Sequence, residues 1–397
     1  MTPYIIANPP CGTYKGDLPL GYAYYHTLLD IHSRFLRDSK DLEVLCPKYS
    51  LNVLGKRAEN LGLDGTIEDL EKYFSEWVKR GELRDKMNFS FSGNILDISL
   101  ESIKQTVKVF RELHEKGYSF RKGNAFYLDV KKIGGDFNLE RIAQEINFFS
   151  DRSRGEFTRL IKNSIEPVRI TKERQYSIPN PFGGEGISPI FGVSNLWEGH
   201  FDKEIDLMAS SEKELTRYLM LRFLSQVPIS EKLPMRSILI YNYLNPEGGF
   251  DEWDMKELTK DGVGSDSLRY SFAKCFSLSE QKTELGKDLL KGGKKLVYLV
   301  GNLKRLFLKE GLNFEDFQNA NDEVYIEDMS NFKYSLVLRN LEGKLRGVSN
   351  EINASKDKGD FNIQKGELFD KYLTLVRGLT PFCPFISEKV IKDLSNK

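Results

Sequence analysis

The chain has 397 residues, enough for two or three domains, and 40% of them are apolar, a share that suits a soluble globular protein. Its 58 basic residues balance its 58 acidic ones, which excludes a chain drawn onto nucleic acid by overall charge, so RNA binding would need a local basic patch. The four cysteines (Cys11, Cys46, Cys275, Cys383) lie far apart in the sequence, which argues against a zinc site or a disulfide framework. Because the sequence shows no signal peptide and no long apolar run, we expect a cytoplasmic protein and not a membrane protein.

The first 81 residues alternate between strand and helix patterns. Residues 4–8 (YIIAN) predict a short buried strand that stops at Pro9-Pro10, and 42–46 (LEVLC) predict a second one. Between them, apolar residues recur at helical spacing over 21–37, and 53–81 return to a helical pattern. Strand, helix and strand in this order are typical of the start of a doubly wound α/β sheet.

The rest of the chain predicts further α/β elements and then helices. The expected elements after residue 81 are a helix over 99–117, a strand over 124–130, a charged connector, a loop over 178–200, a helix over 211–225 and a strand over 236–241. Pro228 and Pro234 are expected in the loop before that strand. From about Phe276 the pattern is helical, with helices near 280–310, 330–353, 362–378 and 384–395.

The segment around the first predicted helix comprises Asn8-Pro9-Pro10, residues 16–23 (GDLPLGYA) and residues 30–35 (DIHSRF). It resembles the opening of a class I aminoacyl-tRNA synthetase. In that family the HIGH signature begins the helix after a strand and a proline-containing turn, and its histidines and the helix N-terminus bind ATP phosphates.

Other segments resemble the archaeal and eukaryotic type of leucyl-tRNA synthetase in the family's order. They are residues 51–55 (LNVLG), 113–118 (LHEKGY), 174–179 (RQYSIP), 206–215 (DLMASSEKEL), 264–269 (GSDSLR) and 380–385 (TPFCPF). The resemblance implies an α/β, Rossmann-like catalytic-type domain split by a short connector and followed by a small α-helical bundle that resembles an anticodon-binding domain. The implied halves are 1–130 and 171–275, with the connector at 131–170 and the bundle at 276–397.

Both phosphate-binding signatures of the family are altered. Pro19 and Tyr22 replace the two histidines of HIGH, while Gly21 still permits a close backbone approach and His26 lies one helical turn beyond Tyr22. A packing or surface histidine is the plainer interpretation of His26.

The KMSKS signature would fall between Gly248 and Gly264. Residues 249–254 (GFDEWD) place three carboxylates where that signature has cations, and Lys256 and Lys260 follow on what we expect to be the next helix. In the segment that resembles the amino-acid pocket, Asn52 and Leu54 replace the family's His and Thr, so a leucine preference is not carried over. The connector is also too short for an editing domain.

A basic, amphipathic segment runs from 287 to 309. It combines apolar positions with seven cations and one acid, Asp288. The candidate RNA-binding residues in it are Lys287, Lys291, Lys294, Lys295, Lys304 and Arg305. An ordinary solvated helix face is the alternative interpretation. Arg152, Arg154, Arg159 and Lys162 form a weaker basic cluster, and Trp197 and Trp253 are candidate exposed aromatics.

These patterns predict a degenerate, leucyl-tRNA-synthetase-like protein that does not aminoacylate tRNA and binds a partner. The partner would be RNA (tRNA or rRNA), a ribosome, another protein or a small ligand in the remnant pocket, with no DNA, no metal and no cofactor. The alternative is an enzyme that activates an amino acid with ATP and Mg²⁺ and forms an aminoacyl-adenylate, using Tyr22, His26 and Lys256 or Lys260 in place of the lost residues. The sequence identifies neither the ligand nor the oligomeric state.

Overall fold

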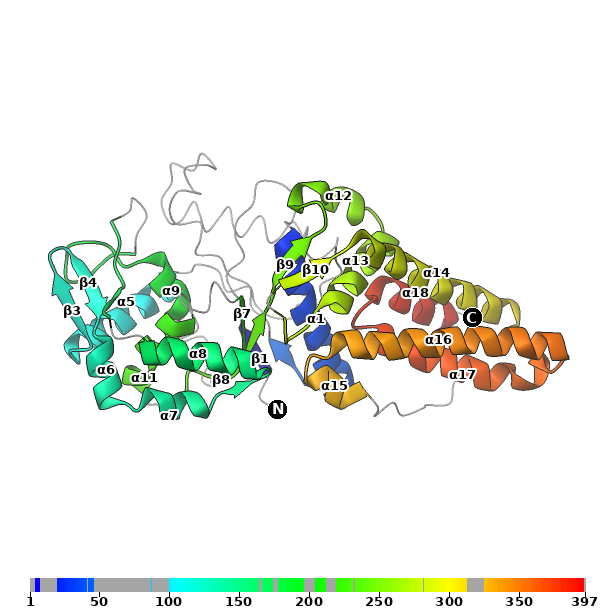
Figure 1. Cartoon of the computed structure of the whole chain (residues 1–397), viewed down its shortest axis with the longest axis horizontal. Helices are drawn as coiled ribbons and strands as arrows, with labels where there is room; N and C mark the ends of the chain where they lie inside the picture. Colours follow the sequence, from blue (N-terminus) through cyan, green and yellow to red (C-terminus); the bar gives the residue numbers. More distant parts are fainter. Residues whose placement is uncertain are drawn as a thin grey trace. The chain divides into compact units, whose positions relative to one another are not determined.

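The protein divides into two compact units (Figure 1). The computed structural model describes residues 4–7, 20–40, 42–45, 87, 100–163, 166–173, 178–195, 204–211, 219–230, 233–280, 282–312 and 325–395. Unit 1 takes in the described parts of 1–16, 43–81 and 91–241. Unit 2 takes in those of 17–42, 82–90 and 242–397.

Unit 1 contains a parallel sheet. Its strands are β1 (Tyr4–Ala7), β2 (Val44–Leu45), β5 (Asn147–Phe148), β7 (Ile205–Ser211) and β8 (Met235–Tyr241). In the described part of the unit the order is β2-β1-β7-β8-β5, and every neighbouring pair is parallel. The strands predicted at 4–8, 42–46 and 236–241 are confirmed as β1, β2 and β8. Parallel strands are buried on both faces, so their sequences are continuous apolar runs.

Parts of this region differ from the expectation. The helix predicted over 211–225 overlaps α11 (Met220–Ser230), but its first residue, Ser211, belongs to β7, and residues 212–218 lie outside the described part of the chain. Pro228, which was expected in a loop, lies inside α11. It is close to the end of the helix, so only a few helical hydrogen bonds are made after it. The segment 178–200 was expected to be mostly loop, and within its described part, 178–195, the helix α9 (Pro189–Asn195) follows the loop. The connector contributes β5 to the main sheet, which was not predicted. Two-residue strands such as β5 are too short for a periodic signal.

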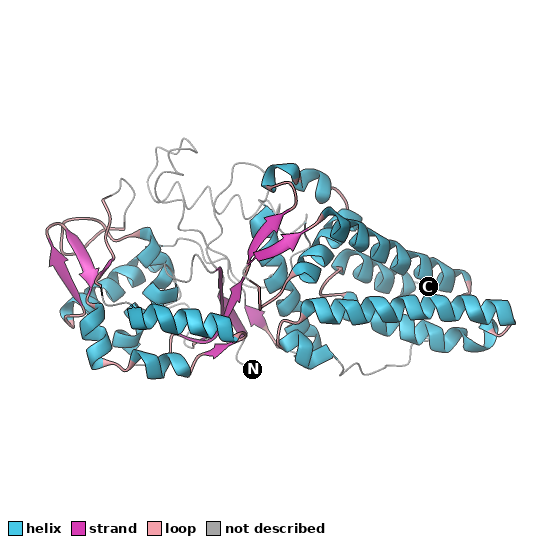
Figure 2. Cartoon of the chain, in the orientation of Figure 1, coloured by secondary structure: helices cyan, strands magenta, loops and turns pink. Residues whose placement is uncertain are grey.

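The remaining elements of unit 1 are helices and a small antiparallel sheet (Figure 2). The helices are α5 (Leu100–Glu115), α6 (Val130–Asp136), α7 (Leu139–Gln144) and α8 (Asp151–Asn163). The sheet has the order β3-β4-β6, formed by Ser119–Lys122, Ala125–Leu128 and Val168–Arg169. The predicted helix 99–117 is confirmed as α5, which ends just before Gly117 in the left-handed region at φ 72°. Buried Phe110, Phe126, Phe157 and Phe223 belong to the core of the unit.

Unit 2 is mainly helical. Its helices are α1 (Leu20–Lys40), α12 (Met255–Leu258), α13 (Gly262–Cys275), α14 (Lys287–Lys309), α15 (Ile326–Ser330), α16 (Tyr334–Lys358), α17 (Phe361–Leu379) and α18 (Pro384–Ser395). The four helices predicted after Phe276 are confirmed as α14, α16, α17 and α18. A parallel strand pair, β9 (Tyr243–Pro246) and β10 (Lys282–Leu285), was not predicted. The predicted α/β class, with a parallel sheet and a helical C-terminal region, is confirmed.

Helix α1 is buried around its whole circumference from Ala23 to Leu36. Several of its buried polar groups are satisfied within the helix: the Thr27 and Ser33 hydroxyls donate to the carbonyls one turn earlier, and Arg34 pairs with Asp30 at 3.0 Å. These bonds stabilise the enclosed helix, since a buried polar group without a hydrogen bond costs about 1–3 kcal/mol.

Candidate functional site

The start of α1 is covered by an aromatic ring of unit 2. A Cβ atom added to Gly21 would lie 3.8 Å from Cε1 of Phe250, so this ring packs against the first turn of the helix. Phe250 belongs to a 3-10 turn, Phe250–Glu252, and its ring also contacts Tyr243 at a centroid distance of 6.3 Å. Pro19, Asn52 and Leu54, and the side chain of Tyr22, lie outside the described residues.

The histidine of this region is not open to solvent. His26 is fully buried, and its ring lies 4.5 Å from that of Tyr25. Tyr24 is buried as well and donates a hydrogen bond of 3.3 Å to Thr283 on β10. Burial raises the pKa of the Tyr24 hydroxyl well above its usual range, so the group stays neutral. These side chains pack the interior of unit 2.

The acidic segment expected in place of KMSKS is folded onto the start of α14. The carboxylate of Glu247 accepts a hydrogen bond of 2.8 Å from the backbone N–H of Lys287, and Glu252 forms an ion pair of 2.6 Å with the Lys287 ammonium. This pairing raises the pKa of Lys287, so its cation is retained. A Cβ atom on Gly248, at φ 76°, would lie 2.2 Å from the Glu252 carboxylate, so that position requires glycine. Glu247 and Glu252 therefore bind the backbone N–H and the side chain of Lys287, the first residue of α14.

Lys256, Lys260 and Trp253, which lie nearby, also interact with other groups of the protein. Lys256 lies on α12, as expected, whereas Lys260, expected on the same helix, lies just beyond its end and pairs with Glu257 at 2.9 Å. Trp253 is buried rather than exposed, and its indole N–H donates to the carbonyl of Glu247 at 2.9 Å. Trp197 lies outside the described residues.

Two of the synthetase-like segments, 264–269 and 380–385, contact each other. The carboxylate of Asp266 on α13 accepts hydrogen bonds from the backbone N–H groups of Phe385 (3.1 Å) and Ile386 (2.7 Å) in the first turn of α18. Arg269 donates to the carbonyls of Pro381 (2.7 Å) and Phe382 (3.2 Å). Burial raises the pKa of Asp266 to about 7, although the two N–H groups and Arg269 act in the opposite direction. These residues hold the C-terminal helix in place and are structural.

The cations of α14 form a stripe along one side of the helix. The stripe consists of Lys287, Lys291, Lys294, Lys295, Arg305 and Lys309, all exposed. Each member lies three or four residues or a multiple of a helical turn away from other members, so they lie on one face of the helix. The helix has 23 residues and is roughly 34 Å long. The opposite face, with Leu296, Val300 and Phe307, is buried.

The cations differ in their pairing. Lys287 pairs with Glu252, Lys291 with Asp288 at 2.8 Å, and Lys304 with Asp393 of α18. Lys304 is only 12% exposed and is not part of the stripe. Within the described residues, no carboxylate forms an ion pair with the remaining four stripe cations, which are Lys294, Lys295, Arg305 and Lys309.

Tyr298 was missed by the sequence reasoning. It lies in the middle of the stripe, four residues after Lys294 and seven before Arg305, and its side chain is 57% exposed. An aromatic residue on the cationic face of an amphipathic pattern was the signal that could have identified it.

Most residues of the weaker basic cluster in the connector interact with a carboxylate or an aromatic ring. Arg159 pairs with Glu156 at 2.8 Å, Lys162 pairs with Glu140 at 3.3 Å, and Arg154 lies over the ring of Phe148. This arrangement favours an ordinary solvated surface over an RNA-binding site for this cluster.

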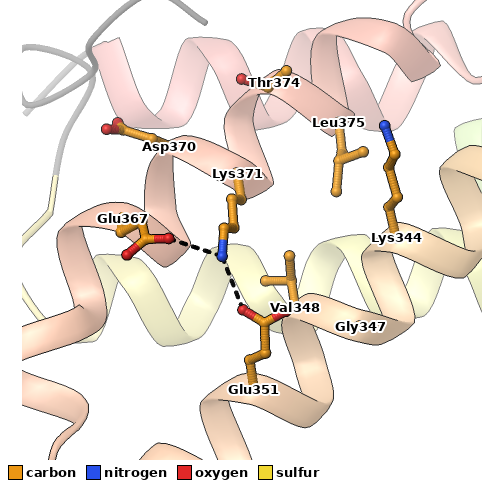
Figure 3. Close-up of a pocket in the computed structure, with 9 residues that line it drawn as sticks. All are labelled: Lys344, Gly347, Val348, Glu351, Glu367, Asp370, Lys371, Thr374 and Leu375. Carbon is orange, nitrogen blue, oxygen red and sulfur yellow. Dashed lines mark hydrogen bonds and ion pairs between the residues drawn. The ribbon is translucent and has the colours of Figure 1, made fainter. Parts of the chain in front are cut away.

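A pocket of about 470 Å³ lies between α16 and α17 (Figure 3). Lys371 spans it, pairing with Glu351 at 3.1 Å and with Glu367 at 2.9 Å. Val348 and Leu375 supply apolar surface. The central cation is already matched by two carboxylates, so this pocket points to no particular ligand.

In the described part of the chain, no three His, Cys, Asp or Glu side chains are grouped so that they could hold a metal ion. None of the described helices combines the length and apolar character needed to cross a bilayer.

Solved structures similar to the whole chain are class I aminoacyl-tRNA synthetases. Mycobacterium tuberculosis methionyl-tRNA synthetase in complex with methionyl-adenylate superposes with a TM-score of 0.73 at 12% identity, covering 98% of this chain and 93% of that one. A second methionyl-adenylate complex of this enzyme gives the same score and identity, covering 98% and 94%. Its apo form gives 0.67 at 13% identity, covering 98% and 91%. No family model and no curated protein matches the sequence. The chain therefore has the fold of a class I synthetase catalytic domain followed by a helical bundle.

Proposed function

We propose that this chain, which has the fold of a class I synthetase, binds RNA and does not attach amino acids to tRNA. The observation that carries the proposal is the stripe on α14, with four cations that no described carboxylate pairs. Lysine and arginine side chains in such a row neutralise successive phosphates of a polynucleotide, and this contact is largely independent of base sequence.

The rigidity of α14 supports this use of the stripe. Gly293, on the buried side of the helix, lies so close to α13 that an added Cβ atom would be 2.8 Å from the backbone of Ser267. The helix is therefore fixed against its neighbour and the cations are presented from a rigid element. Preorganised cations lose less conformational entropy on binding than cations on a mobile loop.

The absence of aminoacylation is supported by the segment 247–254. In the KMSKS-containing relatives this part of the chain supplies cations to ATP, whereas here Glu252 is paired with Lys287 and Phe250 packs on the first turn of α1. A triphosphate near Asp251 and Glu252 would meet like charge where compensation is needed. The methionyl-tRNA synthetases with the same fold act on tRNA, as their name states, so a tRNA is the first RNA to test. The leucyl-type resemblance stays a prediction.

The test is the affinity of the whole chain for a folded, fluorescently labelled tRNA, measured by anisotropy over a range of salt concentrations. The variant Lys294→Ala/Lys295→Ala/Arg305→Ala/Lys309→Ala is expected to bind more weakly and to reduce the slope of log K against log[salt] by about 3, since each lost phosphate contact removes about 0.7 to 0.9. Arg111→Ala/Lys131→Ala, which removes two exposed cations of unit 1, is the control and should leave the slope nearly unchanged. An unaltered slope in the four-residue variant would contradict the proposal.

A second candidate function is ATP-dependent activation of an amino acid. The adenylate complexes among the similar structures favour it, because that reaction occurs on this fold. It would need magnesium, ATP and donors that replace those of the two altered signatures. Pyrophosphate exchange in the presence of each of the twenty amino acids separates the two functions.

A further inference from the structure

A row of three flat side chains crosses the antiparallel sheet β3-β4-β6 of unit 1. Phe120 lies directly opposite Tyr127 in the β3-β4 pairing, and Tyr127 lies directly opposite Arg169 in the β4-β6 pairing. Directly opposite residues share a face of a sheet, and neighbouring strands are about 4.8 Å apart. The register therefore places two aromatic rings and a guanidinium side by side.

This row lies on the face of the sheet away from the core. The alternate residues of β4, Phe126 and Leu128, are buried, and the ring of Phe126 packs on Phe110 of α5 at a centroid distance of 5.3 Å. Phe120 and Tyr127 are only half-buried, and the side chain of Arg169 is 47% exposed. The outer face thus keeps aromatic surface in contact with solvent.

The three groups are held in position. The rings of Phe120 and Tyr127 are nearly parallel, with 18° between their planes and 5.8 Å between their centroids. Glu185 fixes the Arg169 guanidinium through an ion pair, and the Thr171 hydroxyl donates to Glu185 at 3.2 Å. Because these contacts already restrict the side chains, a ligand that stacks on them loses little further entropy.

We propose that this row is a binding site for unpaired nucleotides of an RNA strand. Bases stack on aromatic rings and on arginine guanidinium planes, and sheets that present such a row bind single strands in this way. Lys122, exposed on β3 two residues after Phe120 and on the same face, supplies a cation for a phosphate. The inference rests on the proposed RNA-binding function and adds a separate site that reads unpaired RNA, whereas the stripe on α14 contacts the backbone.

A single strand suits this face better than a duplex or a peptide. The bases of a duplex are stacked inside the helix and do not present their faces to a protein sheet. A peptide has no flat base faces to stack on the row, and Lys122, exposed on the same face, complements a polyanion. The probes are therefore a short oligouridine, which has little structure of its own, and an RNA duplex of equal length.

The experiment uses the full chain in the four-residue stripe variant, so that the remaining binding of oligouridine reports on unit 1. Tyr127→Leu, which keeps apolar volume and removes the aromatic face, is expected to weaken binding about tenfold, whereas Tyr127→Phe retains it. Tyr243→Leu removes a more exposed aromatic, in unit 2, and is the control. Photocrosslinking should place uridine adducts on the tryptic peptides that carry Phe120 and Tyr127, and duplex RNA should give none there.

The outcomes separate this inference from the proposed function. Unchanged oligouridine affinity in a folded Tyr127→Leu variant, or adducts confined to α14, would overturn the site on the sheet and leave RNA binding by the stripe intact. Failure of the unmodified chain to bind either probe or tRNA would overturn both. Equal weakening by Tyr127→Phe and Tyr127→Leu would show that the hydroxyl, and not stacking, is recognised, and would also reject the inference.

Discussion

Arg269 of α13 and Asp30 of α1 form an ion pair of 2.8 Å in which both side chains are fully buried. Arg269 also donates to the carbonyls of Met87, Pro381 and Phe382, so each of its donor groups has an acceptor. The Asp30 carboxylate is shared with Arg34 at 3.0 Å. Burial of two charges is tolerated only when such additional hydrogen bonds satisfy them.

Removing one partner of this pair should be strongly destabilising. We expect Arg269→Met to lower the free energy of unfolding by about 3–5 kcal/mol, because Asp30 and three carbonyl groups would lose a donor inside the protein. Urea-induced unfolding followed by circular dichroism measures the change. Lys371→Met, which breaks the exposed pairs of Lys371 with Glu351 and Glu367, is the control and should cost no more than about 1 kcal/mol. Equal costs for the two variants would contradict the structural role given to Arg269.

His32 should make the stability depend on pH. Burial lowers the pKa of its imidazole to about 3, with a smaller contribution from Lys40, and its ring stacks on Phe332 at 4.3 Å. In the unfolded chain the group titrates near its ordinary value of about 6.5. Between these two values the unfolded state binds the proton and the folded state does not, so the stabilisation is present above about 6.5 and is lost as the pH falls toward 3.

We therefore expect the free energy of unfolding of the unmodified chain to fall relative to that of His32→Leu on acidification below pH 6.5, by at most about 1.4 kcal/mol per pH unit. The difference between the two proteins is what matters, because the raised pKa of Asp266 contributes a slope of opposite sign between about pH 4 and 7. A constant difference from pH 7 to 4 would argue against neutral burial of His32.

Gly293 and Gly343 should respond in opposite directions to alanine. At Gly293 a Cβ atom would meet the backbone of Ser267 at 2.8 Å, so Gly293→Ala must push α14 away from α13 and is expected to cost about 1–3 kcal/mol. At Gly343, on the exposed side of α16, no atom lies within 4 Å, so alanine should stabilise the helix by about 0.5–1 kcal/mol. Thermal unfolding of the two variants compares them, and a stabilising Gly293→Ala would disprove the close helix crossing.

ATP with magnesium should not stabilise the protein. A ligand that binds only the folded state raises the apparent free energy of unfolding, and the increase grows with the ratio of ligand concentration to Kd. At a ligand concentration of one hundred times Kd the increase is about 2.7 kcal/mol. The melting temperature should therefore stay unchanged at saturating ATP and Mg²⁺, and pyrophosphate exchange should be absent with every amino acid. A clear upward shift together with exchange would favour the activating enzyme over the RNA-binding protein.

Local patterns in the sequence were sufficient for the long helices and for three strands of the parallel sheet. The apolar spacing in α14 identified its buried side, and the cations left over identified the exposed stripe, because helical periodicity fixes which residues share a face. The same reasoning failed at β5, β9 and β10, whose pairing partners are distant in sequence. It also placed Ser211 in a helix, although the residue extends β7.

The sequence by itself therefore determined the class of the fold, the order of the main elements and the charge of each helix face. Only the tertiary structure decided that Asp266 and Arg269 hold the chain around residues 381–386, that Phe250 lies on Gly21, and that Phe120, Tyr127 and Arg169 form one row. The physical reason is that periodicity records whether a side chain faces the core, whereas the identity of its neighbour depends on strand register and helix packing between segments far apart in the chain.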